Sequence, residues 1–266
     1  MIDAEADKIF RSRARAFGLN PDNPWIGGYV DYEWDHGRHF LTAYAPDLHA
    51  ATVLELGCNV GGSAVVLALL GASVTGIDID ELYVELAALN ASRHGVRTAR
   101  FHHLADSKAL AFPDGSFDMV TCNSVLEYVA PDDLQPILRE IDRVLIPGGL
   151  FIVAGTSNRL WPREVHSGRW FVNYLPRGID LALGHRTPRP RGLSPWSVLR
   201  ALPGYRQLCL EDGGKAYIGA HRAAGVRRAK LWGLAGIAAL GPITRISAGM
   251  LTPSFFLALR KGGPVR

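Results

Sequence analysis

The amino-acid sequence predicts an α/β fold in which a mostly parallel sheet carries helices on both faces. Apolar runs rich in β-branched residues alternate with helical patterns through residues 52–155, as they do in consecutive βαβ units. The first run breaks into a glycine-rich turn at residues 57–62, and the second ends on Asp78, about twenty residues later. These observations indicate a Rossmann-like, doubly wound fold.

The order of elements follows from periodicity and from the turn residues between them. A helical pattern over residues 1–17 ends at the Asn- and Pro-rich stretch 20–24, and an aromatic segment, 25–44, leads into the core. Ligands bind beyond the carboxyl ends of the strands in such a sheet. In chain order, the core is predicted as strand 52–56, helix 62–70, strand 73–78, helix 80–94, strand 98–102, strand 117–122, helix 131–145 and strand 150–155.

The glycine turn predicts a nucleotide site. Gly57 and Gly61 let the backbone turn sharply and approach a ligand closely, because a side chain there would take the ligand's space. Asn59 stands where a dinucleotide fingerprint has its second glycine, and asparagine is the other residue that best tolerates positive φ. The carboxylate of Asp78 can accept hydrogen bonds from both hydroxyls of a ribose. We therefore expect an adenosine-containing cofactor.

Three further segments narrow the choice of cofactor. They are Ala-Asp-Ser at 105–107, the Phe-Asp-x-Val strand within 110–129, and the Pro-Gly-Gly turn at 147–149. With the glycine turn, they resemble the class I S-adenosylmethionine-dependent methyltransferases of the small-molecule branch, over roughly residues 50–160. The resemblance implies a seven-stranded, mostly parallel sheet closed by an antiparallel C-terminal strand pair. The candidates for that pair are residues 205–210 and 254–259.

The resemblance also implies S-adenosylmethionine as the cofactor and assigns roles to individual residues. Glu55 would orient the methionine end, Asp78 would bind the ribose, and Asp106 would accept the adenine amine. The chain departs from the family pattern at Asn59 and at Tyr128, where many members have glycine and histidine. The complete set of cofactor-binding candidates is Glu55, Gly57, Asn59, Gly61, Asp78, Ile79, Asp106, Ser107 and Asn123.

A catalytic base is predicted in the loop after the strand 150–155. A sulfonium methyl group is already electrophilic, so an enzyme chiefly aligns the nucleophile and excludes water. A hydroxyl nucleophile also benefits from a base, and His166 is the candidate because its ordinary pKa is near operating pH. Glu164 could orient His166 or act itself. Transfer to oxygen is therefore preferred, with carbon and nitrogen acceptors open. The alternative is that His166 is structural and proximity alone suffices.

Composition favours one domain in a reducing compartment. With 266 residues and 48% hydrophobic content, the chain can bury one large core. Its three cysteines are far apart and form no Cys-x-x-Cys pair, and the pair His102-His103 lacks a third ligand, so neither a disulfide framework nor a metal site is expected. The acidic start is unlike a signal peptide, which favours the cytoplasm. We expect an N-terminal helical and aromatic lid segment, a cofactor-binding core and a substrate-side part of the same domain, at 1–50, 51–160 and 161–266.

Charge is distributed unevenly along the chain. Residues 1–150 hold 11 Lys and Arg against 21 Asp and Glu, whereas residues 151–266 hold 18 against 4, so the net charges are −10 and +14. The basic part indicates an anionic partner, unless the two parts neutralise each other. Nucleic acid is a minority interpretation, because no aromatic strand face is interleaved with basic residues.

An unusual insertion spans residues 223–250. Arg227, Arg228 and Lys230 precede about ten apolar residues, which are too few for a bilayer span. Three interpretations stay open: an ordinary buried helix, a surface helix at an anionic membrane, or a lid over an apolar substrate. The basic, apolar composition favours an amphipathic acceptor, such as a lipid-linked, sugar or natural-product compound, and permits peripheral membrane association.

Two other kinds of protein remain as alternatives. An NAD-dependent oxidoreductase could use the same βαβ unit, and a non-catalytic chain could bind S-adenosylmethionine as an adaptor. The aromatic segment is also open to two interpretations. It could be a lid, with an arginine meeting the methionine carboxylate, or a brace on the sheet; its residues are Tyr29, Tyr32, Trp34, His36 and Arg38.

Overall fold

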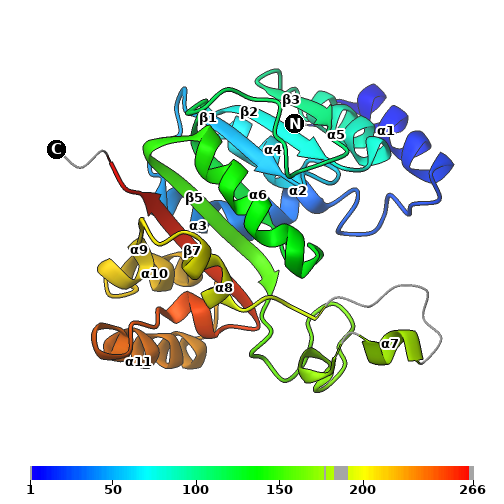
Figure 1. The fold of residues 1–266 in the computed structure, drawn as a ribbon. Helices are drawn as coiled ribbons and strands as arrows, with labels where there is room; N and C mark the ends of the chain where they lie inside the picture. Colours follow the sequence, from blue (N-terminus) through cyan, green and yellow to red (C-terminus); the bar gives the residue numbers. More distant parts are fainter. Residues whose placement is uncertain (1, 177, 183–190, 264–266) are drawn as a thin grey trace.

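A seven-stranded sheet forms the centre of the described part of the chain. The computed structural model describes residues 2–176, 178–182 and 191–263. The strand order is β3-β2-β1-β4-β5-β7-β6, with β1 to β5 parallel, β7 antiparallel to β5, and β6 antiparallel to β7 (Figure 1). The predicted Rossmann-like sheet with its antiparallel C-terminal pair is confirmed. The strands are β1 (Thr52–Leu56), β2 (Ser73–Asp78), β3 (Ala99–His103), β4 (Phe117–Asn123), β5 (Leu145–Ser157), β6 (Tyr205–Gln207) and β7 (Ser254–Lys261).

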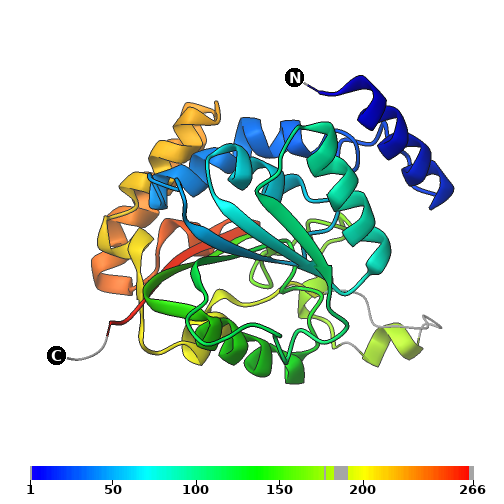
Figure 2. The same ribbon diagram turned by 90° about the horizontal axis from the view of Figure 1, so that it is seen from above.

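Helices cover both faces of the sheet, which gives three layers (Figure 2). Because side chains alternate along a strand, Leu54 packs in one core with α6 (Pro131–Val144) and α8 (Pro195–Ala201). Its neighbour Val53 packs on the other face. That face is covered by α3 (Arg38–Tyr44), α4 (Gly62–Leu69), α10 (Lys215–Ala223) and α11 (Arg228–Thr244).

The N-terminal helix α1 (Ala4–Ala16) packs against α5 (Glu81–Arg93). The Asp3 side chain caps α1 by accepting from the Ala6 N–H at 2.8 Å, as a helix N-cap should. Phe10 is fully buried in a small core with Leu86 of α5. The remaining described helical segments are α2 (Tyr29–Tyr32), the π-helix η1 (Glu33–Gly37), η2 (Val172–Tyr174), α7 (Gly178–Ala182), α9 (Leu208–Glu211) and η3 (Ala248–Leu251).

Two predicted strands have different boundaries. Strand β5 runs over Leu145–Ser157 rather than 150–155, because Leu145 already pairs with Phe117. The next pair is Met119 with Leu150, so residues 146–149, which hold the Pro-Gly-Gly turn, bulge out of the strand. The predicted strand 205–210 ends at residue 207. The chain then turns into α9, which buries Cys209 in the core rather than continuing along the sheet edge.

The C-terminal insertion folds as a helical layer. Helix α11 extends through Pro242 to Thr244 and is longer than the apolar run that predicted it. Among the described residues, no helix is both long and apolar enough to cross a membrane. The arginine- and proline-rich residues 186–190, part of the basic charge noted above, lie outside the described residues.

Candidate active site

The glycine turn lies at the carboxyl ends of β1, β2 and β4. The backbone N–H groups of Gly57 and Cys58 both donate to the Ile77 carbonyl, at 2.8 and 3.0 Å, and this ties the turn to the end of β2. Gly57 and Gly61 have φ of +70° and +77°, and Asn59 has φ of +48°. Asparagine therefore adopts the left-handed conformation that was expected of it.

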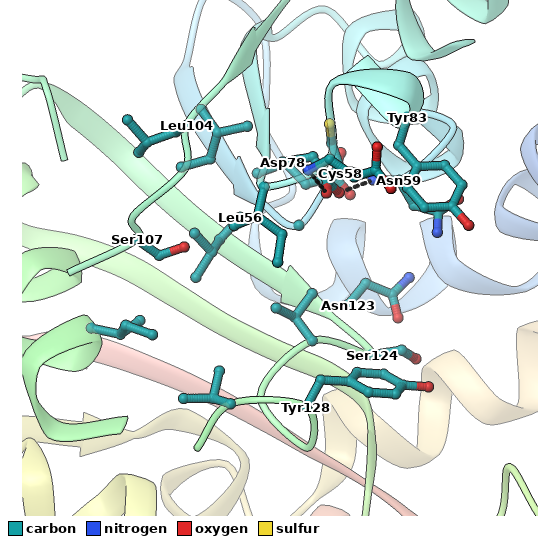
Figure 3. A pocket seen from close by; sticks show the side chains of 18 of the residues that line it. Leu56, Cys58, Asn59, Asp78, Tyr83, Leu104, Ser107, Asn123, Ser124 and Tyr128 are labelled. Atoms are coloured by element: carbon teal, nitrogen blue, oxygen red, sulfur yellow. Dashed lines mark hydrogen bonds between the residues drawn. The ribbon is translucent and has the colours of Figure 1, made fainter. Parts of the chain in front are cut away.

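Asp78 is held in place by the same turn. Its Oδ2 accepts from the Asn59 N–H at 2.8 Å, and its Oδ1 accepts from the Asp80 N–H at 3.1 Å (Figure 3). A carboxylate oxygen has more than one acceptor site, so each oxygen can take a further hydrogen bond from a ligand hydroxyl. The backbone thus fixes the orientation of the carboxylate in advance.

A cavity of about 1010 Å³ opens beside this turn. In Figure 3, Asn123, Ser124 and Tyr128 lie on the opposite side of the cavity from Asp78 and Asn59. The structure brings most of the predicted cofactor residues to its wall: Glu55, Gly57, Asn59, Asp78, Ile79, Asp106, Ser107 and Asn123.

Gly57 lines this cavity and Gly61 does not, and both positions are also crowded by the protein's own side chains. A Cβ on Gly61 would lie 3.0 Å from the Cβ of Ala87 in α5. A Cβ on Gly57 would lie 2.5 Å from a methyl group of Val125. The two glycines therefore leave room for the protein's own side chains, and that they also leave room for a ligand stays a prediction.

The cavity fits the parts of S-adenosylmethionine. Ile79, which is 66% exposed, and Leu104 offer apolar surface near the polar Asp106 and Ser107, as an adenine ring requires. At the other end, Glu55 is buried and its Oε2 has no hydrogen-bond partner among the described residues. Burial and the nearby Glu33 raise the pKa of Glu55 well above its usual value. The unpartnered Oε2 atom is available to a polar group of a ligand.

Glu33 and Tyr29 are site residues that sequence reasoning did not single out for these roles. Glu33 comes from the π-helix, and Asn123 donates its side-chain amide to Glu33 Oε1 at 3.0 Å and to the Tyr29 hydroxyl at 3.2 Å. Burial raises the pKa of Glu33 to about 7, although the hydrogen bonds from Asn123 and Tyr29 oppose the rise. The i, i+4 spacing of Tyr29 and Glu33 was a weak signal that both face one side.

A second cavity of about 480 Å³ adjoins the first. Trp25, Tyr29, Asn123, Ser124 and His166 line both cavities, and this set is called the shared wall below. The aromatic segment contributes side chains to both cavities. Residues on both sides of Arg38, such as Tyr29 and Phe40, line the cavities, whereas Arg38 stacks 4.6 Å above Trp34 and lines neither. The other aromatic and charged side chains of the second cavity are Tyr32, Glu33, His36, Phe40, Tyr217, His221, Lys230, Phe255 and Phe256.

His166 on the shared wall is paired with a buried carboxylate. Its Nε2 lies 3.0 Å from Oε1 of Glu127, a side chain with 0% exposure. This hydrogen bond raises the pKa of His166 above its ordinary value, against the effect of burial. Glu127 lies within the segment 110–129, but nothing in the sequence distinguishes it as the partner of a residue 39 positions away.

Glu164 occupies a different place from the one expected. Its carboxylate accepts from the Ser157 hydroxyl and from the backbone N–H groups of His166 and Ser167, and it lines neither cavity. Burial would raise the pKa of Glu164, but these hydrogen bonds lower it. Glu164 thus shapes the loop that carries His166, and the ring itself is held by Glu127.

Comparison with known proteins agrees with this geometry. Residues 54–153 match the family model of a methyltransferase domain. Ubiquinone biosynthesis O-methyltransferases are similar to the chain. The one from Pseudomonas paraeruginosa is 35% identical over 153 residues, which is 56% of this chain and 63% of the relative. The one from Pseudomonas syringae pv. tomato is 32% identical over 154 residues, 57% of this chain and 64% of the relative. The matches thus span less than two thirds of these relatives.

Solved structures share the fold. An S-adenosylmethionine-dependent methyltransferase from Mesorhizobium loti is 22% identical, with a TM-score of 0.51 over 83% of this chain and 95% of that one. A protein described as the [4+2]-cyclase SpnF is also 22% identical, with a TM-score of 0.52 over 85% of this chain and 80% of that one. The second likeness shows that the fold by itself does not define the reaction.

The fold and the glycine-turn site define a nucleotide-binding α/β protein of the doubly wound type. The methyltransferase domain matched over residues 54–153 and the similar O-methyltransferases support a class I S-adenosylmethionine-dependent methyltransferase. The cofactor of that family is S-adenosylmethionine, and the NAD-dependent alternative has no support from the matched domain.

Proposed function

We propose that this chain transfers a methyl group from S-adenosylmethionine to a hydroxyl oxygen of a small amphipathic acceptor. The observation that carries the proposal is the position of His166. Its ring lies on the shared wall between the two cavities and is fixed by the buried Glu127. A base at the junction of a cofactor cavity and a second cavity is where a hydroxyl proton has to be removed.

The residues of the first cavity would hold the cofactor, which supplies an electrophilic methyl group when bound. Asp78 would accept from the ribose hydroxyls, and Asp106 with Ser107 would bind the adenine edge. Glu55 and the turn at Gly57 and Asn59 would hold the methionine end. These groups would hold the cofactor in one orientation beside the shared wall, and such orientation can supply about 7–11 kcal/mol of a reaction barrier.

His166 would act as the general base. Glu127 holds Nε2 of the ring, which leaves Nδ1 to accept the proton of an acceptor hydroxyl. The buried carboxylate also stabilises the imidazolium that forms, as the acidic member of a catalytic triad does. Tyr128, whose ring centroid is 5.6 Å from that of His166, covers the same junction.

The second cavity would take the acceptor. Its aromatic lining suits an apolar or aromatic body, and Lys230 and the hydroxyl side chains suit a polar or anionic end. The similar O-methyltransferases are named for ubiquinone biosynthesis, which supports transfer to oxygen. The cavity walls come from residues 25–41 and 152–256 as well as the core, in keeping with the proposed lid, core and substrate-side segments. A cytoplasmic chain that associates peripherally with an anionic membrane through its basic, apolar C-terminal segment would suit such an acceptor.

Titration calorimetry tests the cofactor part of the proposal. We expect the chain to bind S-adenosylmethionine and S-adenosylhomocysteine but not NAD, with Asp78→Ala weakening both by about tenfold or more, the effect of losing hydrogen bonds to a charged group. Asp35→Ala, an exposed acid outside both cavities, is the control. Binding of NAD alone, or equal affinity of Asp78→Ala and Asp35→Ala for S-adenosylmethionine, would contradict the assignment.

A further inference from the structure

Helix α11 is apolar on two opposite sides, and the described chain covers only one of them. Leu231, Leu234 and Ala238 are buried on one side, and the last two pack in the core that also holds Tyr217 of α10. On the other side, Trp232, Leu240 and Ile243 are 79%, 58% and 85% exposed. With 3.6 residues per turn, these three fall in an arc of about 80° centred opposite the buried residues. Figure 1 shows α11 as the outermost helix of its layer.

The exposed side forms a continuous apolar strip, here called the outer face of α11. Small residues fill the spaces between its three large side chains: Ala229, Gly233, Gly236 and Ala239 are all exposed. A surface helix of a globular protein normally presents polar residues to water. A helix with an apolar stripe on its solvent side is therefore built to be covered by something else.

The surroundings of the outer face are positively charged. Arg227 and Arg228 precede the helix or begin it, Lys230 lies in its first turn, and Arg245 caps its C-terminal end. Within the described residues, none of the four forms an ion pair or a side-chain hydrogen bond. The sequence also holds no Asp or Glu after residue 212. What covers the outer face should therefore be anionic where it meets these cations and apolar beneath.

A lipid surface fits this description better than a second protein. A stable protein interface needs roughly 800 Å² from each partner. Even a large aromatic side chain offers at most about 250 Å², so one tryptophan and two aliphatic side chains on a single helix fall short of that area. A helix with an apolar strip, a tryptophan and flanking arginines matches the pattern of helices that lie in an anionic headgroup region.

We propose that the outer face of α11 docks the chain on an anionic lipid surface, with Trp232, Leu240 and Ile243 at the boundary of headgroups and acyl chains. Arg227, Arg228 and Arg245 then lie at the lipid phosphates. The role that we give to this docking rests on the proposed function, because it assumes an amphipathic acceptor. Lys230 of the same helix lines the acceptor cavity, so docking brings that cavity to the surface where an amphipathic acceptor is concentrated.

Vesicle co-sedimentation of the full chain tests the docking. The vesicles are pure phosphatidylcholine or an equal mixture of phosphatidylcholine and phosphatidylglycerol. We expect partitioning onto the anionic vesicles to exceed that onto neutral ones by about tenfold or more and to fall at high salt. The double variant Trp232→Glu and Ile243→Glu should partition onto the anionic vesicles at least tenfold less than the unaltered chain. Ile9→Glu changes a 51% exposed residue on α1 and should bind as the unaltered chain does.

A second variant keeps the test valid if the double variant misfolds. Arg227→Glu with Arg228→Glu adds acidic residues at a helix start, where they are tolerated, and should abolish the preference for anionic vesicles. Equal binding to both vesicle types, no binding to either, or an equal loss in Ile9→Glu would overturn the proposal. The proposal would also be overturned if light scattering showed that the unaltered chain is a dimer and that the double variant is a monomer. S-adenosylmethionine affinity, measured on the same samples, reports separately on the proposed function.

Discussion

The first cavity is the proposed cofactor site, called the cofactor cavity here, and the second is the proposed acceptor site, called the acceptor cavity. The two cavities share a wall, but they are built in different ways. The cofactor cavity is formed by loops that follow β1, β2 and β4, and its key carboxylate, Asp78, is fixed by backbone N–H groups. The acceptor cavity is formed by side chains from segments far apart in the chain, such as Phe40, Tyr217 and Phe256. The fold topology thus determines the first cavity, and long-range packing determines the second.

Glu33, on the acceptor side of the junction, should make stability depend on pH. Burial raises its pKa to about 7, above the ordinary value of 4.5 that applies in the unfolded chain. The folded state therefore binds this proton more tightly, and the stability that the neutral carboxyl contributes is lost as pH rises from about 5 through 7. We expect a loss of up to about 3 kcal/mol in the free energy of unfolding.

Denaturant titrations at pH 5 and pH 8 measure this loss. Glu33→Gln cannot ionise and should lose less stability between the two pH values than the unaltered chain. The exposed Glu81→Gln serves as the control and should follow the unaltered chain. If Glu33→Gln shows the same pH dependence as the unaltered chain, the pKa of Glu33 is not raised by folding.

Gly57, on the cofactor side, should be sensitive to a single methyl group. Gly57→Ala places a Cβ at 2.5 Å from Val125 in a left-handed conformation, which should cost about 1–3 kcal/mol beyond the backbone strain. Gly148→Ala is the matched control, because Gly148 has φ of +78° and nothing within 4 Å of its Cβ position. Thermal unfolding measures the stability of each variant. In the background Val125→Ala, Gly57→Ala should cost less stability than it does in the unaltered chain. No difference between Gly57→Ala and Gly148→Ala would show that Val125 moves aside freely.

Most of the cofactor-binding candidates taken from the sequence line one cavity, because the motifs that carry them are local. A glycine turn, an acidic strand end and the strand-helix alternation lie in one continuous segment, and each has a recognisable spacing. The partner of His166 could not be predicted in the same way. Glu127 reaches it across 39 residues through the packing of two loops, whereas the neighbouring Glu164 turned out to cap the loop backbone. Similarly, alternation at 205–210 predicted a strand, but the burial of Cys209 ended it at residue 207.

Glu127→Gln tests whether Glu127 tunes His166 as a base or only supports the fold. Removing the carboxylate charge lowers the pKa of His166 toward its ordinary value, because the Glu127 hydrogen bond is the main cause of the rise. The base is active when it is neutral, so the acidic limb of the kcat profile should move to lower pH while kcat falls about tenfold. S-adenosylmethionine affinity should stay the same. An unshifted pH profile would mean that Glu127 serves only the fold.

The most direct test of the account is methyl transfer itself. The full chain is incubated with S-adenosylmethionine that carries a labelled methyl group and with a panel of amphipathic phenols and alcohols, alongside His166→Ala. We predict that the label appears on a hydroxyl oxygen and that His166→Ala lowers kcat by about 10²- to 10⁴-fold, with unchanged affinity for S-adenosylmethionine. Equal transfer by both proteins, or transfer to carbon or nitrogen alone, would contradict the assignment of His166 as the base at the junction of the two cavities.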